Sequence, residues 1–219
     1  MKEIKKGLFF VFEGIDGAGK STQAALLAGA LLKSGREVET YRDPGGTPLG
    51  ENVREMLLDK SAYPDLSFAA EALLYAAARA QLVAGKIGPA LALGRIVIGD
   101  RFGDSTIAYQ CFGRGIDLGL LTGVNNLATG GLTPDLTFLL DLSPELSKKR
   151  IVGEEDRMEQ EKAAFFRRVR EGYLSLAEQR PGAYHVLDAS LNKEEIHRRV
   201  VEAVEVFTGE VIQRNLRAE

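Results

Sequence analysis

A glycine-rich segment near the start of the chain contains the residue types that bind phosphate. Residues 14–21 read GIDGAGKS and match the pattern G-x-x-x-x-G-K-[ST] in full. In such a P-loop the backbone N–H groups surround an anion, the lysine reaches the β- and γ-phosphates, and the hydroxyl binds Mg²⁺. Lys20 and Ser21 would fill these two roles. The predicted nucleoside triphosphate site comprises Gly14, Ile15, Asp16, Gly17, Ala18, Gly19, Lys20, Ser21 and Thr22.

An acidic residue at the end of a second apolar segment could share the metal ion. Residues 95–100 read RIVIGD. P-loop proteins use an aspartate that follows a buried strand to hold Mg²⁺, directly or through water. We therefore predict that Ser21 and Asp100 together bind the Mg²⁺ that accompanies the nucleotide.

The later part of the chain argues against a GTPase switch. Residues 43–46 read DPGG and fit the D-x-x-G motif of such switches. A guanine-reading N/T-K-x-D motif should then follow, but residues 192–195 read NKEE and lack the aspartate. A GTPase switch is therefore only a remote alternative.

The rest of the sequence contains several arginines that could surround a ligand, but it shows no evident acid–base pair. A hydroxyl acceptor of a phosphoryl group needs a carboxylate to orient or deprotonate it. A phosphate acceptor is already ionised, and it needs cations that relieve the repulsion between two anions. The pattern favours a small kinase with a phosphate acceptor. The arginines that we place in or beside the ligand-facing segments are Arg42, Arg54, Arg79, Arg101, Arg150 and Arg157.

Five short apolar or β-branched segments must position these residues. The predicted strands are 7–13, 37–42, 95–100, 135–141 and 184–188, and each ends in a polar or charged residue. Ligands of open parallel sheets bind outside the carboxyl ends of the strands. The charged strand ends are therefore expected around the ligand.

Helical segments are predicted between the strands. They cover 20–33, 48–59, 66–93 in one or two pieces, 104–112, 117–128, 156–178 and 193–207. Strands that alternate with helices form a parallel sheet with right-handed crossovers. We expect an α/β fold of the P-loop NTPase or kinase type, with a doubly wound five-stranded parallel sheet and helices on both faces. A single domain over residues 1–219 accounts for the pattern.

Composition and charge limit the partners of the chain. The 219 residues carry a net charge of −3 with both signs scattered, which argues against general binding to nucleic acid or to a membrane surface. The apolar start leads directly into the P-loop without a cleavage site, so it is predicted to be a core strand and not a signal peptide. Cys111 is the only cysteine, which excludes an internal disulfide and favours a cytoplasmic location.

The chain resembles the thymidylate kinase (dTMP kinase) family of P-loop nucleoside monophosphate kinases over about residues 7–205. The matching stretches are FEGIDGAGKSTQ, YRDPGGTPLGENVR, EALLYAAARAQ, GDRFGDSTIAYQ, PDLTFLLDLSPE and EEDRMEQEKAAFFRRVREGYLSLA. The P-loop occurs in many families, whereas the D-P-G-G-T-P and D-R-F-x-x-S-x-x-A-Y-Q segments are far more specific. The resemblance implies transfer of the γ-phosphoryl group of Mg·ATP to dTMP. The alternatives are another nucleoside monophosphate kinase or a hydroxyl-accepting deoxynucleoside kinase.

The resemblance also assigns residues to the acceptor. It implies that Arg101 binds the 5′-phosphate with Arg42 and Arg54 nearby. Tyr109 would pack under the sugar, where a 2′-hydroxyl would clash, and Asp16 would lie near the 3′-hydroxyl. The implied dTMP site consists of Asp16, Arg42, Pro44, Arg54, Tyr75, Arg79, Arg101, Ser105, Thr106, Tyr109 and Gln110.

A short mobile lid over ATP is implied as well, at about residues 145–158. Since the P-loop lacks an arginine, a lid residue would bring positive charge to the transferring phosphoryl group. Either Arg150 or Arg157 would do so, with Lys149 in reserve. The expected catalytic residues are Lys20, Arg101, Arg150 and Arg157. Residues 188–190 would approach the adenine, and we expect a homodimer because the family forms homodimers.

Overall fold

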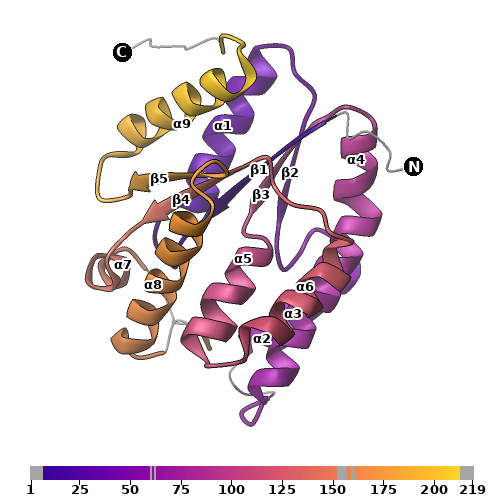
Figure 1. Cartoon of the computed structure of the whole chain (residues 1–219), viewed down its shortest axis with the longest axis vertical. Coiled ribbons are helices and arrows are strands. Elements are labelled where there is room, and N and C mark those ends of the chain that lie inside the picture. Colours follow the sequence, from indigo (N-terminus) through magenta and orange to yellow (C-terminus); the bar gives the residue numbers. More distant parts are fainter. Residues whose placement is uncertain (1–6, 60, 62, 152–156, 159–160, 213–219) are drawn as a thin grey trace.

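Five parallel strands form the centre of the molecule, which the computed structural model describes over residues 7–59, 61, 63–151, 157–158 and 161–212. The strands pair in the order β2-β3-β1-β4-β5 (Figure 1). Their bounds are β1 Leu8–Glu13, β2 Val38–Arg42, β3 Ile96–Asp100, β4 Leu136–Asp141 and β5 Tyr184–Asp188. All pairings are parallel, so the carboxyl ends of the strands meet at one edge of the sheet. The predicted sheet is confirmed, and each strand ends at the predicted residue.

Helices connect the strands. Their bounds are α1 Lys20–Lys33, α2 Pro48–Leu58, α3 Phe68–Leu82, α4 Gly88–Ala92, α5 Gly103–Thr106, α6 Leu118–Thr129, α7 Pro144–Arg150, α8 Ala163–Gln179 and α9 Lys193–Thr208. Two π-helical segments, η1 Val83–Ile87 and η2 Ile107–Gly113, continue α3 and α5. The helical stretch predicted over 66–93 is therefore α3, η1 and α4 in direct succession. No helix in the described part of the chain is long and apolar enough to cross a membrane.

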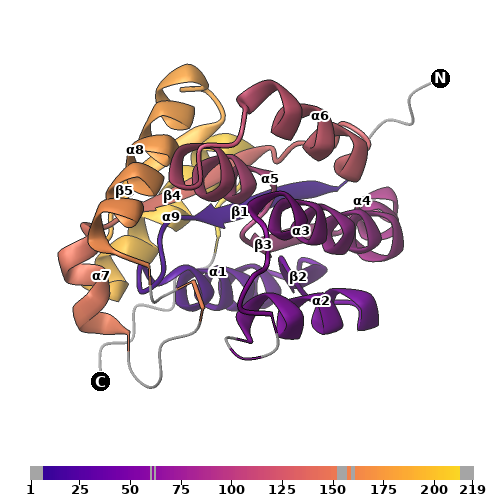
Figure 2. The same cartoon turned by 90° about the horizontal axis from the view of Figure 1, so that it is seen from below.

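Alternate side chains of β1 pack against helices on opposite faces of the sheet. Phe10 and Phe12 belong to a core cluster that includes residues of α1 and α9. Phe9 and Val11 belong to a second cluster, which includes residues of α3, η1 and α4. This alternation follows the two-residue period of a strand. Figure 2 shows α1 on one side of the sheet and α5, α6 and α8 on the other, so the predicted cover on both faces is confirmed.

The helix predicted over 156–178 is wrong at its start. It begins at Ala163, because residues 157–158 form a turn that is attached to the end of α2. In this turn the backbone N–H of Arg157 donates to the carbonyl oxygen of Leu58 at 3.4 Å. Residues 152–156, which belong to the predicted lid, lie outside the described residues.

Helix α7 is an addition to the predicted elements and overlaps the segment expected to be the lid. The Ser143 side chain accepts a hydrogen bond from the backbone N–H of Leu146, and Pro144 occupies the first helical position. Both residues are typical of a helix start. The described beginning of the lid segment is thus an ordered helix that follows β4.

Candidate active site

The P-loop joins β1 to α1 and lies tightly against two neighbouring segments. Gly14 has a φ of +139°, and a Cβ atom there would lie 2.5 Å from the carbonyl oxygen of Leu140. Gly17 has a φ of +73°, and a Cβ atom there would lie 2.9 Å from the carbonyl oxygen of Ser147. Glycine is the residue that meets both conditions. The first N–H groups of α1 lack helical partners and are available to an anion at the loop.

Lys20 is the first residue of α1 and is buried against the P-loop. Its Nζ donates to the carbonyl oxygen of Ile15 at 2.9 Å and lies 3.9 Å from Asp16 Oδ1. Burial and the positive charge of Arg101 lower the pKa of Lys20 to about 8, against the opposing effect of Asp16. A poorly solvated ammonium beside a ring of N–H groups attracts phosphate strongly. Lys20 thus lies where its predicted role requires it, and the role itself stays a prediction.

Ser21 and Asp100, the two predicted metal ligands, lie side by side. The Ser21 hydroxyl donates a hydrogen bond to Asp100 Oδ2, which joins the start of α1 to the end of β3. Hydroxyl and carboxylate oxygens suit Mg²⁺, which typically binds few protein ligands together with substrate phosphates and water. Among the described residues, no group of three or more His, Cys, Asp or Glu side chains could hold a metal ion. The pair therefore fits a metal that a bound nucleotide also coordinates.

Arg101 follows Asp100 and has a fixed guanidinium group. Its φ of +71° is unusual for a residue other than glycine and costs about 1–2 kcal/mol. The groups that accept hydrogen bonds from this guanidinium are the Gly14 carbonyl, the hydroxyls of Ser105, Tyr173 and Tyr109, and the Asp16 carboxylate. Burial would lower the pKa of Arg101, but Asp16 and the tyrosines outweigh burial and raise it well above its usual value. The guanidinium of Arg101 therefore stays positively charged, and its hydrogen bonds fix its orientation.

Asp16 in the P-loop is the counter-ion of Arg101. Its other oxygen accepts a hydrogen bond from the Tyr109 hydroxyl at 3.0 Å. Burial alone would raise the pKa of Asp16, but Arg101 and Lys20 outweigh it and lower the pKa to about 2. Asp16 is therefore ionised at neutral pH and is a weak base.

Glu13 ends β1 just before the P-loop and supports the same group of side chains. It is fully buried and accepts hydrogen bonds from the Ser105 hydroxyl at 2.6 Å and the Tyr173 hydroxyl at 3.0 Å. Burial raises the pKa of Glu13 to about 7. Sequence reasoning identifies Glu13 only as one of the charged strand ends. No sequence signal indicates Tyr173, which comes from α8 and reaches the site through the tertiary fold.

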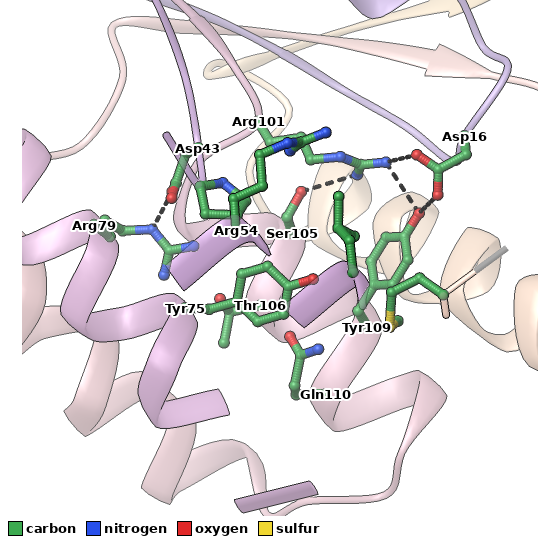
Figure 3. Close-up of a pocket in the computed structure, with 13 residues that line it drawn as sticks. Asp16, Asp43, Arg54, Tyr75, Arg79, Arg101, Ser105, Thr106, Tyr109 and Gln110 are labelled. Atoms are coloured by element: carbon green, nitrogen blue, oxygen red, sulfur yellow. Dashed lines mark hydrogen bonds and ion pairs between the residues drawn. The ribbon is translucent and has the colours of Figure 1, made fainter. Parts of the chain in front are cut away.

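A pocket opens beside Arg101, and Figure 3 shows its lining side chains. The pocket, called the arginine pocket below, encloses about 570 Å³ when the solvent at its open mouth is included. It is lined by Asp16, Asp43, Pro44, Arg54, Leu58, Tyr75, Arg79, Arg101, Ser105, Thr106, Tyr109, Gln110 and Met158. Every predicted acceptor-site residue lines it except Arg42, which pairs with Glu51 at 3.0 Å. Asp43, Leu58 and Met158 line it although the sequence did not identify them as site residues.

Two arginines line the arginine pocket in different ways. Arg54 makes no hydrogen bond or ion pair with any residue that the structure describes, and burial and the nearby Arg42 lower its pKa. Arg79 is only 1% exposed and donates to Asp43 Oδ2 at 2.6 Å and to Asn125 Oδ1 at 2.8 Å. Arg54 is therefore available to an anionic ligand, whereas the charge of Arg79 is already compensated.

Helix α3 presents three polar residues at a spacing of four. Glu71, Tyr75 and Arg79 therefore share one face of the helix, and the last two line the arginine pocket. Glu71 is fully buried beneath it and accepts hydrogen bonds from Gln110 and Arg157. Sequence reasoning identified Tyr75 and Arg79 but missed Glu71, although the same spacing would have indicated it.

The two candidate lid arginines lie in different surroundings. Arg150 ends α7, and its Nη1 donates to the carbonyl oxygen of Ala189 at 2.9 Å, in the segment after β5. Helix α7 is attached to the P-loop, because the Ser147 hydroxyl donates to the Asp16 carbonyl oxygen at 2.7 Å. Arg157 instead lies beside α2 and α3, where its Nε donates to the Leu57 carbonyl oxygen at 2.8 Å.

The arrangement provides two neighbouring sites for anions. The first combines the N–H groups of the P-loop with Lys20. The second is the arginine pocket, where Arg54 has no partner among the described residues and the Arg101 guanidinium is directed toward Asp16 (Figure 3). A site of this kind can bring two phosphorylated molecules together and neutralise their charge.

The chain is similar to known proteins of one family. The family model described as thymidylate kinase matches residues 12–200. A thymidylate kinase from Pelotomaculum thermopropionicum is 47% identical over 216 residues, which cover 97% of this chain and 100% of that protein. One from Desulforudis audaxviator is 54% identical over 185 residues, 84% of this chain and 83% of that protein. The crystal structure of thymidylate kinase from Ehrlichia chaffeensis matches with a TM-score of 0.75 and 35% identity, over 91% of this chain and 98% of that one.

Proposed function

The chain belongs to the thymidylate kinase family, and we propose that it binds ATP at the P-loop and dTMP in the arginine pocket. The reaction converts dTMP to dTDP by transfer of the γ-phosphoryl group. The observation that supports this assignment of the two sites is the position of Arg54 and Arg101, which line the pocket next to the loop. Two guanidinium groups at the end of a pocket suit a phosphate monoester.

On the donor side, the P-loop N–H groups and Lys20 would bind the β- and γ-phosphates. Ser21 and Asp100 would hold Mg²⁺, since their oxygens already lie within hydrogen-bonding distance of each other. When bound, Mg²⁺ would neutralise charge on the β- and γ-phosphate oxygens. Lys20 would neutralise charge on the same phosphate oxygens from the buried side of the loop.

A phosphate acceptor fits the acids of this site better than a hydroxyl acceptor. Asp16 lines the pocket, but Arg101 and Lys20 hold its pKa at about 2, which makes it a poor base. Glu13 has a pKa of about 7, but it is fully buried and does not line the pocket. An ionised phosphate needs no base, and the cations relieve its repulsion from the donor. The hydroxyl-accepting nucleoside kinase is therefore the weaker candidate.

Arg150 is the better candidate for the lid cation on the donor side. It ends α7, which is hydrogen-bonded to the P-loop through Ser147. Arg150 also starts beside the loop, since a Cβ atom added at Gly17 would lie 3.5 Å from the Cβ of Arg150. Arg157 is held by Glu71 and belongs to the acceptor side. Residues 145–158 would act as the lid of a single kinase domain over 1–219.

Tyr109 and Asp16 would contact the sugar of dTMP. The Tyr109 hydroxyl is hydrogen-bonded to Asp16, so the ring is fixed beside the acceptor phosphate site. The resemblance to the family implies that a 2′-hydroxyl would clash with this ring, and on that ground we infer a deoxynucleotide as the acceptor. The protein would act in the cytoplasm, where its substrates and a reduced Cys111 are expected.

A panel of acceptors tests the function. ADP release from Mg·ATP is measured with dTMP, dUMP, dCMP, dGMP, UMP and thymidine. We expect the highest kcat/KM for dTMP and a much lower value for thymidine. Preference for thymidine would favour a hydroxyl-accepting kinase, and GTP hydrolysis without any acceptor would favour a switch.

A further inference from the structure

Glu71 lies beneath the arginine pocket and has no exposure to solvent. Its Oε1 accepts hydrogen bonds from Gln110 Nε2 at 2.9 Å and Arg114 Nε at 3.2 Å. Its Oε2 accepts from Arg114 Nη2 at 3.3 Å and from Arg157 Nη2. Burial alone would raise the pKa of Glu71, but the Gln110 hydrogen bond and the two guanidinium groups outweigh burial and lower it. Glu71 is therefore an ionised carboxylate, which accepts hydrogen bonds and donates none.

An acceptor-only partner fixes the orientation of the Gln110 amide. A side-chain amide has an NH₂ end that donates and an oxygen end that accepts, so only Nε2 can face Glu71. The Oε1 atom of Gln110 then points elsewhere, and it has no hydrogen-bond partner among the described residues. Gln110 lines the arginine pocket together with Thr106, one turn earlier, whose buried Oγ1 also lacks a partner. The pocket wall therefore offers polar atoms that a ligand could satisfy.

We propose that Glu71 sets the base specificity of the arginine pocket by holding the Gln110 oxygen toward the base. This inference rests on the proposed function, because it takes the pocket to hold the acceptor nucleotide. A pyrimidine with two carbonyl groups, such as thymine, has an N3–H donor between them. A 4-aminopyrimidine, such as cytosine, has an unprotonated N3 that can only accept. Gln110 Oε1 forms a hydrogen bond with the first base and repels the second.

The other contacts of Glu71 keep its carboxylate in place, so its hydrogen bond to the Gln110 amide is maintained. Both carboxylate oxygens are occupied by guanidinium groups, and Arg114 is itself held over the Phe68 and Phe165 rings at 4.6 and 4.8 Å from their centroids. Rotation of the carboxylate would leave buried cations without a partner, which is costly. Glu71 acts through Gln110 and is therefore a positioning residue.

The decisive variant is Glu71→Gln, which replaces the carboxylate with an amide of the same shape. Residue 71 could then offer either an oxygen or an NH₂ group, and Gln110 would be free to turn its own NH₂ toward the base. We expect the ratio of kcat/KM for dTMP to that for dCMP to fall by about 10- to 100-fold. Most of the change should be a rise in the dCMP value, measured by ADP release with Mg·ATP. Glu71→Asp keeps an acceptor-only group and should preserve most of the ratio.

Glu161→Gln is the matched control. Glu161 also pairs with Arg114 but does not contact Gln110, so its loss of charge should leave the dTMP to dCMP ratio unchanged. Gln110→Leu removes the amide itself and should lower the ratio by a similar factor. If Glu71 acts through Gln110, adding Glu71→Gln to Gln110→Leu should change the ratio no further.

Three results would overturn the proposal. They are an unchanged ratio in a folded Glu71→Gln protein, an equal fall of the ratio in Glu161→Gln, and a wild-type ratio in Gln110→Leu. A wild-type ratio in Gln110→Leu overturns the proposal even if Glu71→Gln fails to fold, which circular dichroism would reveal. Failure of the proposed function would look different, because the wild-type protein would then release no ADP with dTMP.

Discussion

Lys20 places a buried positive charge beside a loop whose N–H groups cannot solvate it. Without a ligand its partners are the Ile15 carbonyl oxygen and Asp16, and burial outweighs them, so the pKa of Lys20 is lowered to about 8. A triphosphate at the loop would favour the charged form. Binding of ATP at the proposed site would therefore be linked to protonation of Lys20.

This linkage predicts how ATP affinity depends on pH. Above the pKa of about 8, Lys20 in the free protein is neutral, and ATP must bind together with a proton. Affinity should be nearly constant from about pH 7 to 8 and then fall by about tenfold per pH unit. Titration calorimetry with Mg·ATP measures the change.

A variant with a permanent charge provides the control. Lys20→Arg remains protonated over this range, so its weaker binding should show no such slope. The same wild-type affinity at about pH 7.5 and about pH 9.5 would show that Lys20 does not gain a proton on binding.

At the scale of elements, sequence predicts where strands end far better than what their last residues contact. A buried parallel strand is an apolar run with a polar end, so every strand end was predictable. The hydrogen bond between Glu13 and Tyr173 spans 160 positions in the sequence, and no local pattern encodes such a pairing. Helix α7 has a local signal in Ser143 and Pro144, just before the segment predicted to be a mobile lid.

The same limit applies to the arginines of the site. Residue type and family motifs predict which arginines matter, and three of these six, Arg54, Arg79 and Arg101, line the pocket. Whether each is free or compensated depends on neighbours from distant elements. Arg79 is neutralised by Asp43 from the segment after β2, while Arg54 has no such partner among the described residues. The sequence therefore indicates which arginines are present, but not which of them are left without an ion-pair partner in the protein and can bind a ligand.

The attachment of α7 to the P-loop predicts unequal roles for the two lid arginines. Arg150→Ala should lower kcat by about 10³-fold with little change in the KM for dTMP, because it removes charge from the transferring phosphoryl group. Arg157→Ala should instead raise the KM for dTMP, because Arg157 is anchored beside the acceptor pocket. Steady-state kinetics with both substrates varied separates these effects.

Arg167→Ala controls for the general loss of a positive charge near the lid. Arg167 is exposed on α8 and pairs with Glu145 on the surface, so kcat should stay at the wild-type value. An equal loss of kcat in Arg150→Ala and Arg167→Ala would refute a specific role for Arg150.

At the scale of the whole molecule, two neighbouring helices expose large leucine side chains to solvent. Helices α3 and α6 pack side by side, and they expose Leu73 by 58%, Leu120 by 68% and Leu127 by 85%. Leu120 and Leu127 are seven residues apart and lie on one face of α6. Large exposed apolar side chains on two helices that pack together are typical of protein interfaces. We propose that this surface forms the homodimer interface expected from the family.

Disruption of this surface should produce a monomer. Leu127→Glu would bury a charge in the proposed interface, and analytical ultracentrifugation should show half the mass of the wild-type protein. Val206→Glu is the control, because Val206 is 86% exposed on α9 and lies outside the surface. A wild-type protein that sediments as a monomer, or a Leu127→Glu protein that remains dimeric, would exclude the interface.

The pairing of Asp16 with Arg101 has a consequence for the end of each catalytic cycle. Arg101, the cation proposed to bind the acceptor phosphate, already forms an ion pair with Asp16 of the protein itself. An arriving phosphate would share this guanidinium with Asp16, so it would gain less than an unpaired guanidinium would give. The same carboxylate would still compensate the cation when dTDP leaves. The ion pair would thereby reduce the affinity of the pocket for the nucleotide and speed the dissociation of dTDP.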